Sequence, residues 1–205
     1  MHVREPLLNW ARIKDLRPTQ MTVGMREVEE KRRRWREHKD KKRAEFLSKH
    51  MIPVILGPKE NHYVIDHHHL TRALLEEGQD EVMISVVAKL QTLDREGFWV
   101  FLDNRSWCHP YDQNGVRRSF EDIPSSVADM RDDPFRSLAG EVRRLGGYSK
   151  ETVPFSEFVW ADFFRRRIKR KTVENDFSTA SERALRLAKT SEADYLPGWC
   201  GPVVE

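Results

Sequence analysis

The sequence predicts a mixed α/β protein (α+β), with an α/β unit over residues 7–105 and a mainly helical region over residues 106–205. Runs rich in valine and isoleucine alternate with helical periodicity in the first half, which is typical of a sheet covered by helices. The last third shows capped helical periodicity without such runs. Between them proline and glycine punctuate the chain, so we place the boundary there. A chain of 205 residues, 39% hydrophobic and 10% aromatic, can build a core and is too aromatic to be disordered.

The expected elements of the first half follow from local patterns. Four glutamates stand four residues before a lysine or arginine, and this favourable order predicts one long, largely solvated helix over residues 24–47. β-Branched residues on both sides of a turn predict a hairpin, and the next periodic segment ends at Gly78. In chain order we expect strands over 11–16, 53–56 and 62–66, a helix over 69–77, a strand over 81–90, and a helix over 92–103 with Thr92 as its N-cap.

Three helices are expected in the second half, each preceded by a residue that caps helices well. The first has Pro134 at its first position and glycines 146–147 at its end. The second carries aromatic residues at buried positions and ends in the basic segment 165–171, where cations complement the helix dipole. The predicted N-caps are Asp132 or Asp133 for the first helix, Ser156 for the second, and Ser178 or Thr179 for the third, which runs to Lys189.

The charge balance and the hydropathy pattern limit the class of partner. With 36 basic and 33 acidic residues the net charge is +3, which by itself does not indicate nucleic acid. Segment 165–171 is basic, but no aromatic residue interleaves with its cations, so we expect a solvated helix end and at most weak nucleic-acid binding. No apolar run reaches the roughly 18 to 20 residues of a membrane span, and no N-terminal signal region is evident, so we expect a cytoplasmic protein without membrane contact.

The densest group of chemically active side chains lies in residues 63–72, where a strand, a tight turn and a helix follow one another. The N-terminus of a helix presents N–H groups that favour anions, and imidazoles beside it donate to phosphate or act as acid or base near neutral pH. The candidate phosphate-binding residues are His67, His68, His69, Thr71 and Arg72.

A structural interpretation of the same residues stays open. Three adjacent histidines cannot all point one way, and Asp66 can serve only as a helix cap. A metal site is a further alternative in which Asp66 is a ligand, although the spacing matches no zinc signature.

The segment from Val64 to His69, followed by a helix with Arg72, resembles the strand–turn–helix of the ParB/sulfiredoxin fold, in its branch of ParB-like nucleases. Residues 17–24 resemble the proline-bearing segment before the first helix of that fold, and the likeness covers roughly residues 7–105. It implies a nucleotide-phosphate pocket in which the histidine turn embraces the phosphates. His69 matches the family histidine, whereas His67 stands where glycine is usual. Leu70 stands where arginine is usual, and Arg72 is the expected substitute.

The resemblance also implies an activity. Members of this superfold include CTP-hydrolysing partition proteins, ATP-using sulfiredoxins and an ADP-dependent serine kinase. We therefore expect phosphoryl transfer or hydrolysis on a nucleotide or a phosphorylated small molecule, with Asp66, His69 and Glu27 as catalytic residues and Asp66 as a ligand of nucleotide-bound Mg²⁺. The alternatives are a metal-dependent nuclease, which cleaves phosphodiesters, and a non-catalytic module that binds a nucleotide or DNA. Sulfiredoxin chemistry is set aside, because no cysteine lies at the turn.

The first helix adds further candidates. Glu27 and Lys31 lie one helical turn apart and face the same way, and the resemblance makes Glu27 or Glu30 the counterpart of a catalytic base. An ordinary exposed ion pair is the alternative interpretation of these two residues. Gln20 and Thr22 precede the helix, where they either cap it or line the pocket, and Lys31 is a third candidate for the pocket lining.

Overall fold

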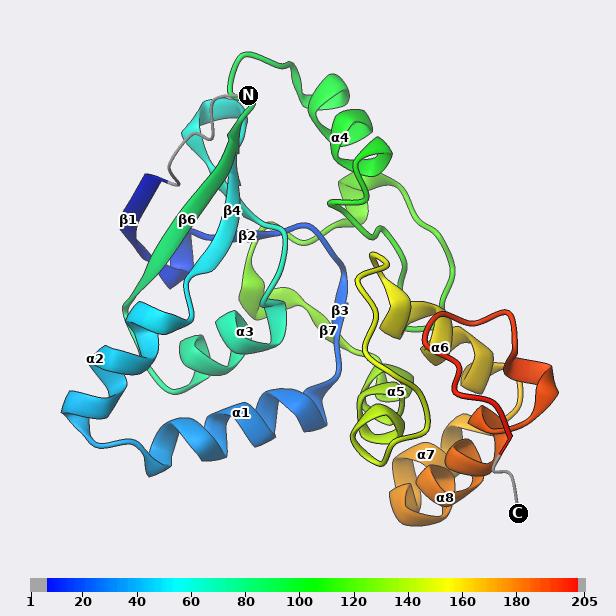
Figure 1. The fold of residues 1–205 in the computed structure, drawn as a ribbon. Helices are drawn as coiled ribbons and strands as arrows, with labels where there is room; N and C mark the ends of the chain where they lie inside the picture. The colour runs from blue at the N-terminus through cyan, green and yellow to red at the C-terminus, as the bar shows by residue number, and fades with distance from the viewer. Residues whose placement is uncertain (1–6, 203–205) are drawn as a thin grey trace. The chain divides into compact units, whose positions relative to one another are not determined.

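The computed structural model describes residues 7–202 and has the mixed α/β class that the sequence predicts (Figure 1). The chain forms two compact units. The first contains the residues up to Val23 together with Val28–Arg131, and the second contains Gly24–Glu27 and the residues from Asp132 onward. Residues 106–131, which the sequence patterns group with the helical region, thus belong to the first unit. They do so because Cys108 and Ile123 are buried in a hydrophobic cluster of that unit.

The first unit is built on a five-stranded sheet of order β1-β6-β4-β5-β2. Strands β1 and β6 are antiparallel, β6 and β4 parallel, β4 and β5 antiparallel, and β5 and β2 parallel. The central position of β4 explains its apolar sequence, because Ile52, Val54 and Ile55 are fully buried. The bounds are β1 Leu7–Arg12, β2 Arg17–Pro18, β4 Ile52–Leu56, β5 His62–Val64 and β6 Glu81–Lys89; the short strands β3 (Thr22–Val23) and β7 (Arg131–Asp132) lie outside this sheet.

The long helix expected over residues 24–47 is wrong, because two helices occupy this segment. Helix α1 (Met25–Glu37) ends where Lys39 turns to extended backbone, and α2 (Asp40–Lys49) begins immediately after it. The ring of Phe46 on α2 contacts the ring of Trp35 on α1, with centroids 5.8 Å apart. The glutamate–lysine and glutamate–arginine pairs correctly predict helical backbone here. They carry no information about the contact between Trp35 and Phe46, which requires a break in the helix.

Two other boundaries of the first unit differ from the expected ones. The strand expected over 11–16 ends at Arg12 and gives way to a 3-10 helix, because Ile13 N–H donates to the carbonyl of Asp80 beyond the last strand pair. The N-cap of α4 (Arg95–Asn104) is Asp94 rather than Thr92, since the Asp94 carboxylate accepts the N–H of Gly97 at 2.7 Å. The remaining helices of this unit are α3 (His68–Glu76) and the 3-10 helices Ile13–Asp15, Pro58–Glu60, Phe120–Asp122 and Val127–Asp129.

Among the described helices of the second unit, one begins at the residue that the sequence predicts, and others have a different N-cap residue from the predicted one. Asp133 caps α5 and Pro134 is its first residue, as expected. Phe155, in left-handed backbone, occupies the N-cap position of α6, so Ser156 is the first helical residue rather than the cap. Asp176 caps α8 by accepting the N–H of Thr179. The bounds are α5 Pro134–Arg144, α6 Ser156–Arg165, α7 Arg170–Asn175, α8 Phe177–Ala188 and a 3-10 helix Ser191–Ala193.

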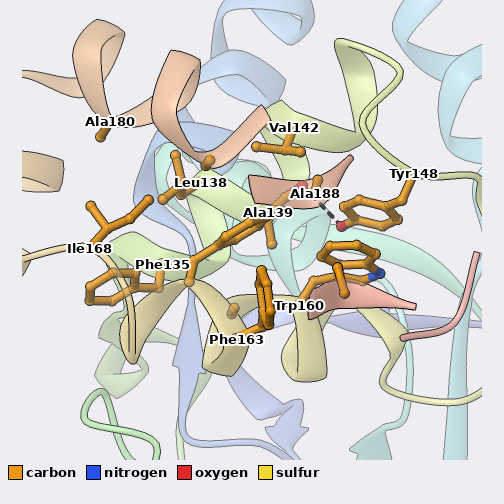
Figure 2. Close-up of a cluster of buried hydrophobic side chains, with 14 of the residues drawn as sticks. Phe135, Leu138, Ala139, Val142, Tyr148, Trp160, Phe163, Ile168, Ala180 and Ala188 are labelled. Carbon is orange, nitrogen blue, oxygen red and sulfur yellow. Dashed lines mark hydrogen bonds between the residues drawn. The ribbon is translucent and has the colours of Figure 1, made fainter. Parts of the chain in front are cut away.

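The core of the second unit surrounds Trp160 (Figure 2). Its indole stacks on the ring of Tyr148, with centroids 4.2 Å apart and ring planes 10° from parallel. The Tyr148 hydroxyl donates to the carbonyl of Ala139 at 2.9 Å, the dashed line in Figure 2. Trp160, Phe163 and Phe164 are all buried, which confirms the core position expected for them, whereas Phe158 of the same helix is only half-buried.

Buried charge also helps to hold the second unit together. The Nη2 atom of Arg165 donates a hydrogen bond to Oδ2 of Asp133 at 2.5 Å. The side chain of Arg165 is 16% exposed and that of Asp133 is 3% exposed. Burial raises the pKa of Asp133, against the opposing effect of Arg165. The expectation of a solvated helix end for the basic segment is therefore wrong for Arg165, whereas Arg166, at 71% exposed, fits it. No described helix of either unit is long and apolar enough to cross a membrane.

Candidate functional site

The turn before α3 places Asp66 and His67 at the surface of the first unit. His67 adopts left-handed backbone, with φ 63° and ψ 25°, at the N-cap position of α3. Histidine tolerates this region better than most side chains, so the turn survives without the glycine usual there. The Asp66 carboxylate accepts the N–H of His67 at 2.6 Å and is 77% exposed. The side chain of His67 itself makes no capping hydrogen bond to the first turn of α3.

His68 points the other way, into the protein. It is 5% exposed, and its Nε2 accepts the N–H of Thr19 at 3.3 Å. Thr19 in turn donates its hydroxyl to the carbonyl of Val64 on β5. The ring therefore ties the segment after β2 to α3, and the phosphate role expected for His68 stays a prediction.

The environment of His67 favours a neutral imidazole. Burial lowers the pKa of His67, and the charges of Lys31 and His50 lower it further, while Asp66 and a backbone hydrogen bond at Met51 act in the opposite direction. The Nε2 atom lies 4.0 Å from Asp66 Oδ2, and the side chain is still 40% exposed. The structure thus brings the expected candidates Asp66, His67 and Lys31 together. It adds His50, which no local pattern in the sequence indicated.

Thr71 and Arg72 are engaged with the protein itself. Thr71 is fully buried, and its hydroxyl donates to the carbonyl of His67 at 3.0 Å. Arg72 donates from Nε to Glu76 and from Nη1 to carbonyls of the loop after residue 126, which are those of Val127, Ala128 and Met130. These contacts hold the turn and the loop in place. A phosphate-binding role for Thr71 or Arg72 stays a prediction, and for Arg72 it requires the guanidinium to leave its present partners.

The other candidates lie in different surroundings. His69 is half-buried one residue inside α3, while Gln20 and Thr22 are buried. Glu27 belongs to the second unit. Its carboxylate lies close to Gly140 of α5, because a Cβ atom added to that glycine would be 3.2 Å from Glu27 Oε2.

Two N–H groups at the start of α1 have side-chain acceptors. Within the second unit, Met25 N–H donates to Asp132 and Arg26 N–H donates to the hydroxyl of Ser137. Among residues 7–202, no group of three His, Cys, Asp or Glu side chains is arranged to hold a metal ion.

The two cysteines should differ sharply in reactivity. Cys108 is buried, and burial together with Asp103 raises its pKa to about 12, whereas Cys200 is exposed. Because the thiolate is the nucleophile, we expect a thiol reagent at pH 8 to modify Cys200 in the folded protein and Cys108 only after unfolding. Mass spectrometry after timed labelling measures this, with Cys200→Ser as the control. Rapid modification of Cys108 in that folded variant would contradict the burial.

Comparison with known proteins supports the same fold. The family model described as "Putative ParB-like nuclease" matches residues 10–166. The crystal structure of protein Atu1540 from Agrobacterium tumefaciens is similar over 99% of this chain and 100% of that one, with 51% identity and a TM-score of 0.92. No curated protein matches. The family match spans more than half of the chain, includes the turn before α3 and agrees with the motif at Val64–His69. The chain therefore belongs to the ParB-like nuclease family.

Proposed function

We propose that this chain binds a nucleotide phosphate at the turn Asp66–His69 and catalyses its transfer or hydrolysis. The observation that carries the proposal is the geometry of His67: a partly exposed imidazole with a lowered pKa, on left-handed backbone at the N-cap position of α3, where its side chain makes no capping hydrogen bond. Such a helix start attracts anions, and a neutral imidazole beside it can accept or deliver a proton.

The surrounding residues suit this chemistry. The first amides of α3 and the positive charge of Lys31 favour a phosphate, and His67 and His69 are the residues proposed to exchange protons with it. Asp66 is the proposed ligand of nucleotide-bound Mg²⁺, whose charge would neutralise phosphate oxygens. Magnesium sites commonly combine one or two carboxylates with phosphate oxygens and water, so a single carboxylate fits.

A second candidate is cleavage of a nucleic-acid phosphodiester by the same residues. The family match favours it, because the description of that family names a nuclease. Both candidates use the phosphate-binding turn and differ in the group attached to the phosphate. A binding module without turnover is the third outcome that an experiment has to separate.

The proposal is tested by comparing His67→Ala with wild type. Removing the imidazole should weaken nucleotide binding about tenfold and slow turnover by about 10²–10⁴, the usual contribution of a general acid or base. Because the pKa of His67 is lowered, wild-type turnover should persist as the pH falls below the ordinary histidine value of about 6.5. Calorimetry with ADP, ATP and CTP, with and without Mg²⁺, measures binding; phosphate release and cleavage of single-stranded DNA measure turnover.

The matched control is His38→Ala, which removes another histidine of the same unit from the junction of α1 and α2. It should leave both quantities unchanged. Phosphate release alone would favour nucleotide hydrolysis or transfer, DNA cleavage alone would favour the nuclease, and binding without either would leave a binding module. A folded His67→Ala protein with wild-type binding and turnover would reject the site.

A further inference from the structure

The backbone of His67 takes a conformation that residues with a Cβ atom seldom adopt. Its φ of 63° and ψ of 25° lie in the left-handed region, where the Cβ atom crowds the following carbonyl oxygen. Such a conformation persists only where the surrounding structure holds it in place. The contacts that hold the backbone of His67 therefore also decide where its imidazole lies.

Three hydrogen bonds within the turn shape this conformation. The carboxylate of Asp66 accepts the N–H of His67 at 2.6 Å. The carbonyl of His67 accepts the N–H of Thr71 at 2.8 Å and the hydroxyl of Thr71 at 3.0 Å. All three bonds join residues between 66 and 71, so they shape the turn without joining it to a strand of the sheet.

His68 supplies a bond from this turn to the sheet. Its ring is 5% exposed, and Nε2 accepts the N–H of Thr19 at 3.3 Å. Thr19 is buried as well, and its hydroxyl donates to the carbonyl of Val64 on β5 at 2.8 Å. The carbonyl of Thr19 accepts the N–H of His109 at 2.9 Å. Because Thr19 directly follows β2, one ring nitrogen joins the start of α3 to the neighbouring strands β2 and β5.

The same bond assigns the tautomer of His68. An imidazole nitrogen that accepts a hydrogen bond carries no proton, so the proton of this ring is assigned to Nδ1. A buried N–H that loses its acceptor is costly, and the chain shifts to find another one. Loss of the Nε2 acceptor would therefore move the start of α3 relative to Thr19, and the adjacent His67 would move with it.

We infer that His68 is a positioning residue for the proposed reaction. Its Nε2 atom, bound to the N–H of Thr19, holds the neighbouring His67 in left-handed backbone and so sets where the His67 imidazole lies beside a phosphate bound at the turn. This role rests on the proposed function and differs from the direct phosphate contact that the sequence led us to expect for His68. The property that matters is the acceptor atom, rather than the volume of the ring.

Two substitutions of His68 separate the acceptor from the volume. His68→Leu fills the space without an acceptor, whereas His68→Gln offers an amide oxygen in place of Nε2. In His68→Leu, kcat should fall about 10²-fold, because a displacement of about 1 Å costs about that much, and KM should change by less than about tenfold. His68→Gln should recover most of kcat. Phosphate release from ADP, ATP and CTP with Mg²⁺ measures both constants. His62→Leu, at a half-buried histidine of β5, is the matched control and should change neither.

Nuclear magnetic resonance of the ligand-free chain tests the inference without any turnover. The Cα and Cβ chemical shifts of His67 report its left-handed backbone, which should persist in His68→Gln and be lost in His68→Leu. In the wild type, Nε2 of His68 should have the shift of an unprotonated nitrogen and a scalar coupling to the amide nitrogen of Thr19. This measurement decides the inference even where His68→Leu does not fold.

The outcomes separate the inference from the proposed function. A proton on Nε2 of His68, or left-handed backbone kept in His68→Leu, would overturn the inference. Equal losses in the leucine and glutamine variants would overturn it too, because ring packing would then be the cause. A wild type without phosphate release, in which the left-handed signature is lost only in His68→Leu, would reject the proposed function and leave His68 as the residue that holds the turn.

Discussion

Replacing Trp160 with alanine is expected to lower the free energy of unfolding of the second unit by about 3–5 kcal/mol. The indole is fully buried, stacks on Tyr148 and contacts the rings of Phe163 and Phe164. Its Nε1–H also donates to the carbonyl of Pro197 at 2.8 Å. The substitution removes a large apolar volume and leaves that carbonyl without its donor, so both losses add.

Urea unfolding followed by circular dichroism and tryptophan fluorescence measures the loss. Val159→Ala is the matched control, because Val159 is the preceding residue of α6 and is 44% exposed. That variant should change stability by less than about 0.5 kcal/mol, as surface substitutions generally do. A loss below about 1 kcal/mol in Trp160→Ala would show that Trp160 is not central to this core.

The second large effect is expected at Asp133. Asp133→Ala removes one partner of a buried ion pair and leaves Arg165 charged and covered, which typically costs about 3–5 kcal/mol. It also removes the N-cap of α5, because Asp133 Oδ1 accepts the N–H of Phe135 at 3.1 Å. Loss of such a cap contributes about 1 kcal/mol of the total.

Two further variants divide these contributions. Asp133→Asn keeps an N-cap side chain but not the charge, so it should lose nearly as much stability as the alanine variant. Asp162→Ala removes the 38% exposed carboxylate that also pairs with Arg165, and should cost no more than about 1 kcal/mol. Thermal unfolding of all three measures the differences. A fully stable Asp133→Asn protein would mean that the cap, rather than the ion pair, carries the stability.

Local patterns in the sequence predicted the elements whose causes are local. Asp133 with Pro134 gave the start of α5, and the β-branched runs gave the central strands, because capping and strand periodicity depend on neighbouring residues. The break between α1 and α2 was missed because its cause is a contact between two rings rather than a turn residue. Phe155 at the N-cap of α6 was missed because aromatic residues seldom adopt left-handed backbone.

The candidate site divides in the same way. The turn Asp66–His69 was predicted from adjacent residues, but nothing local indicates that His68 faces Thr19 while His67 faces solvent. His50 joins the turn only through the tertiary fold.

The start of α1 has a consequence for how the protein is made. Met25 N–H finds its acceptor on Asp132, 107 residues later in the chain. At about 5–20 residues per second, synthesis leaves that group waiting for roughly 5–20 s before its partner exists. Gly24–Glu27 are therefore synthesised between two segments of the first unit, although they belong to the second unit. A fragment cut after Arg131 would carry this orphaned turn, and the remaining fragment would lack it. The fragment that begins at Asp132 thus lacks four residues of its own unit, so the second unit is complete only when one chain carries both parts.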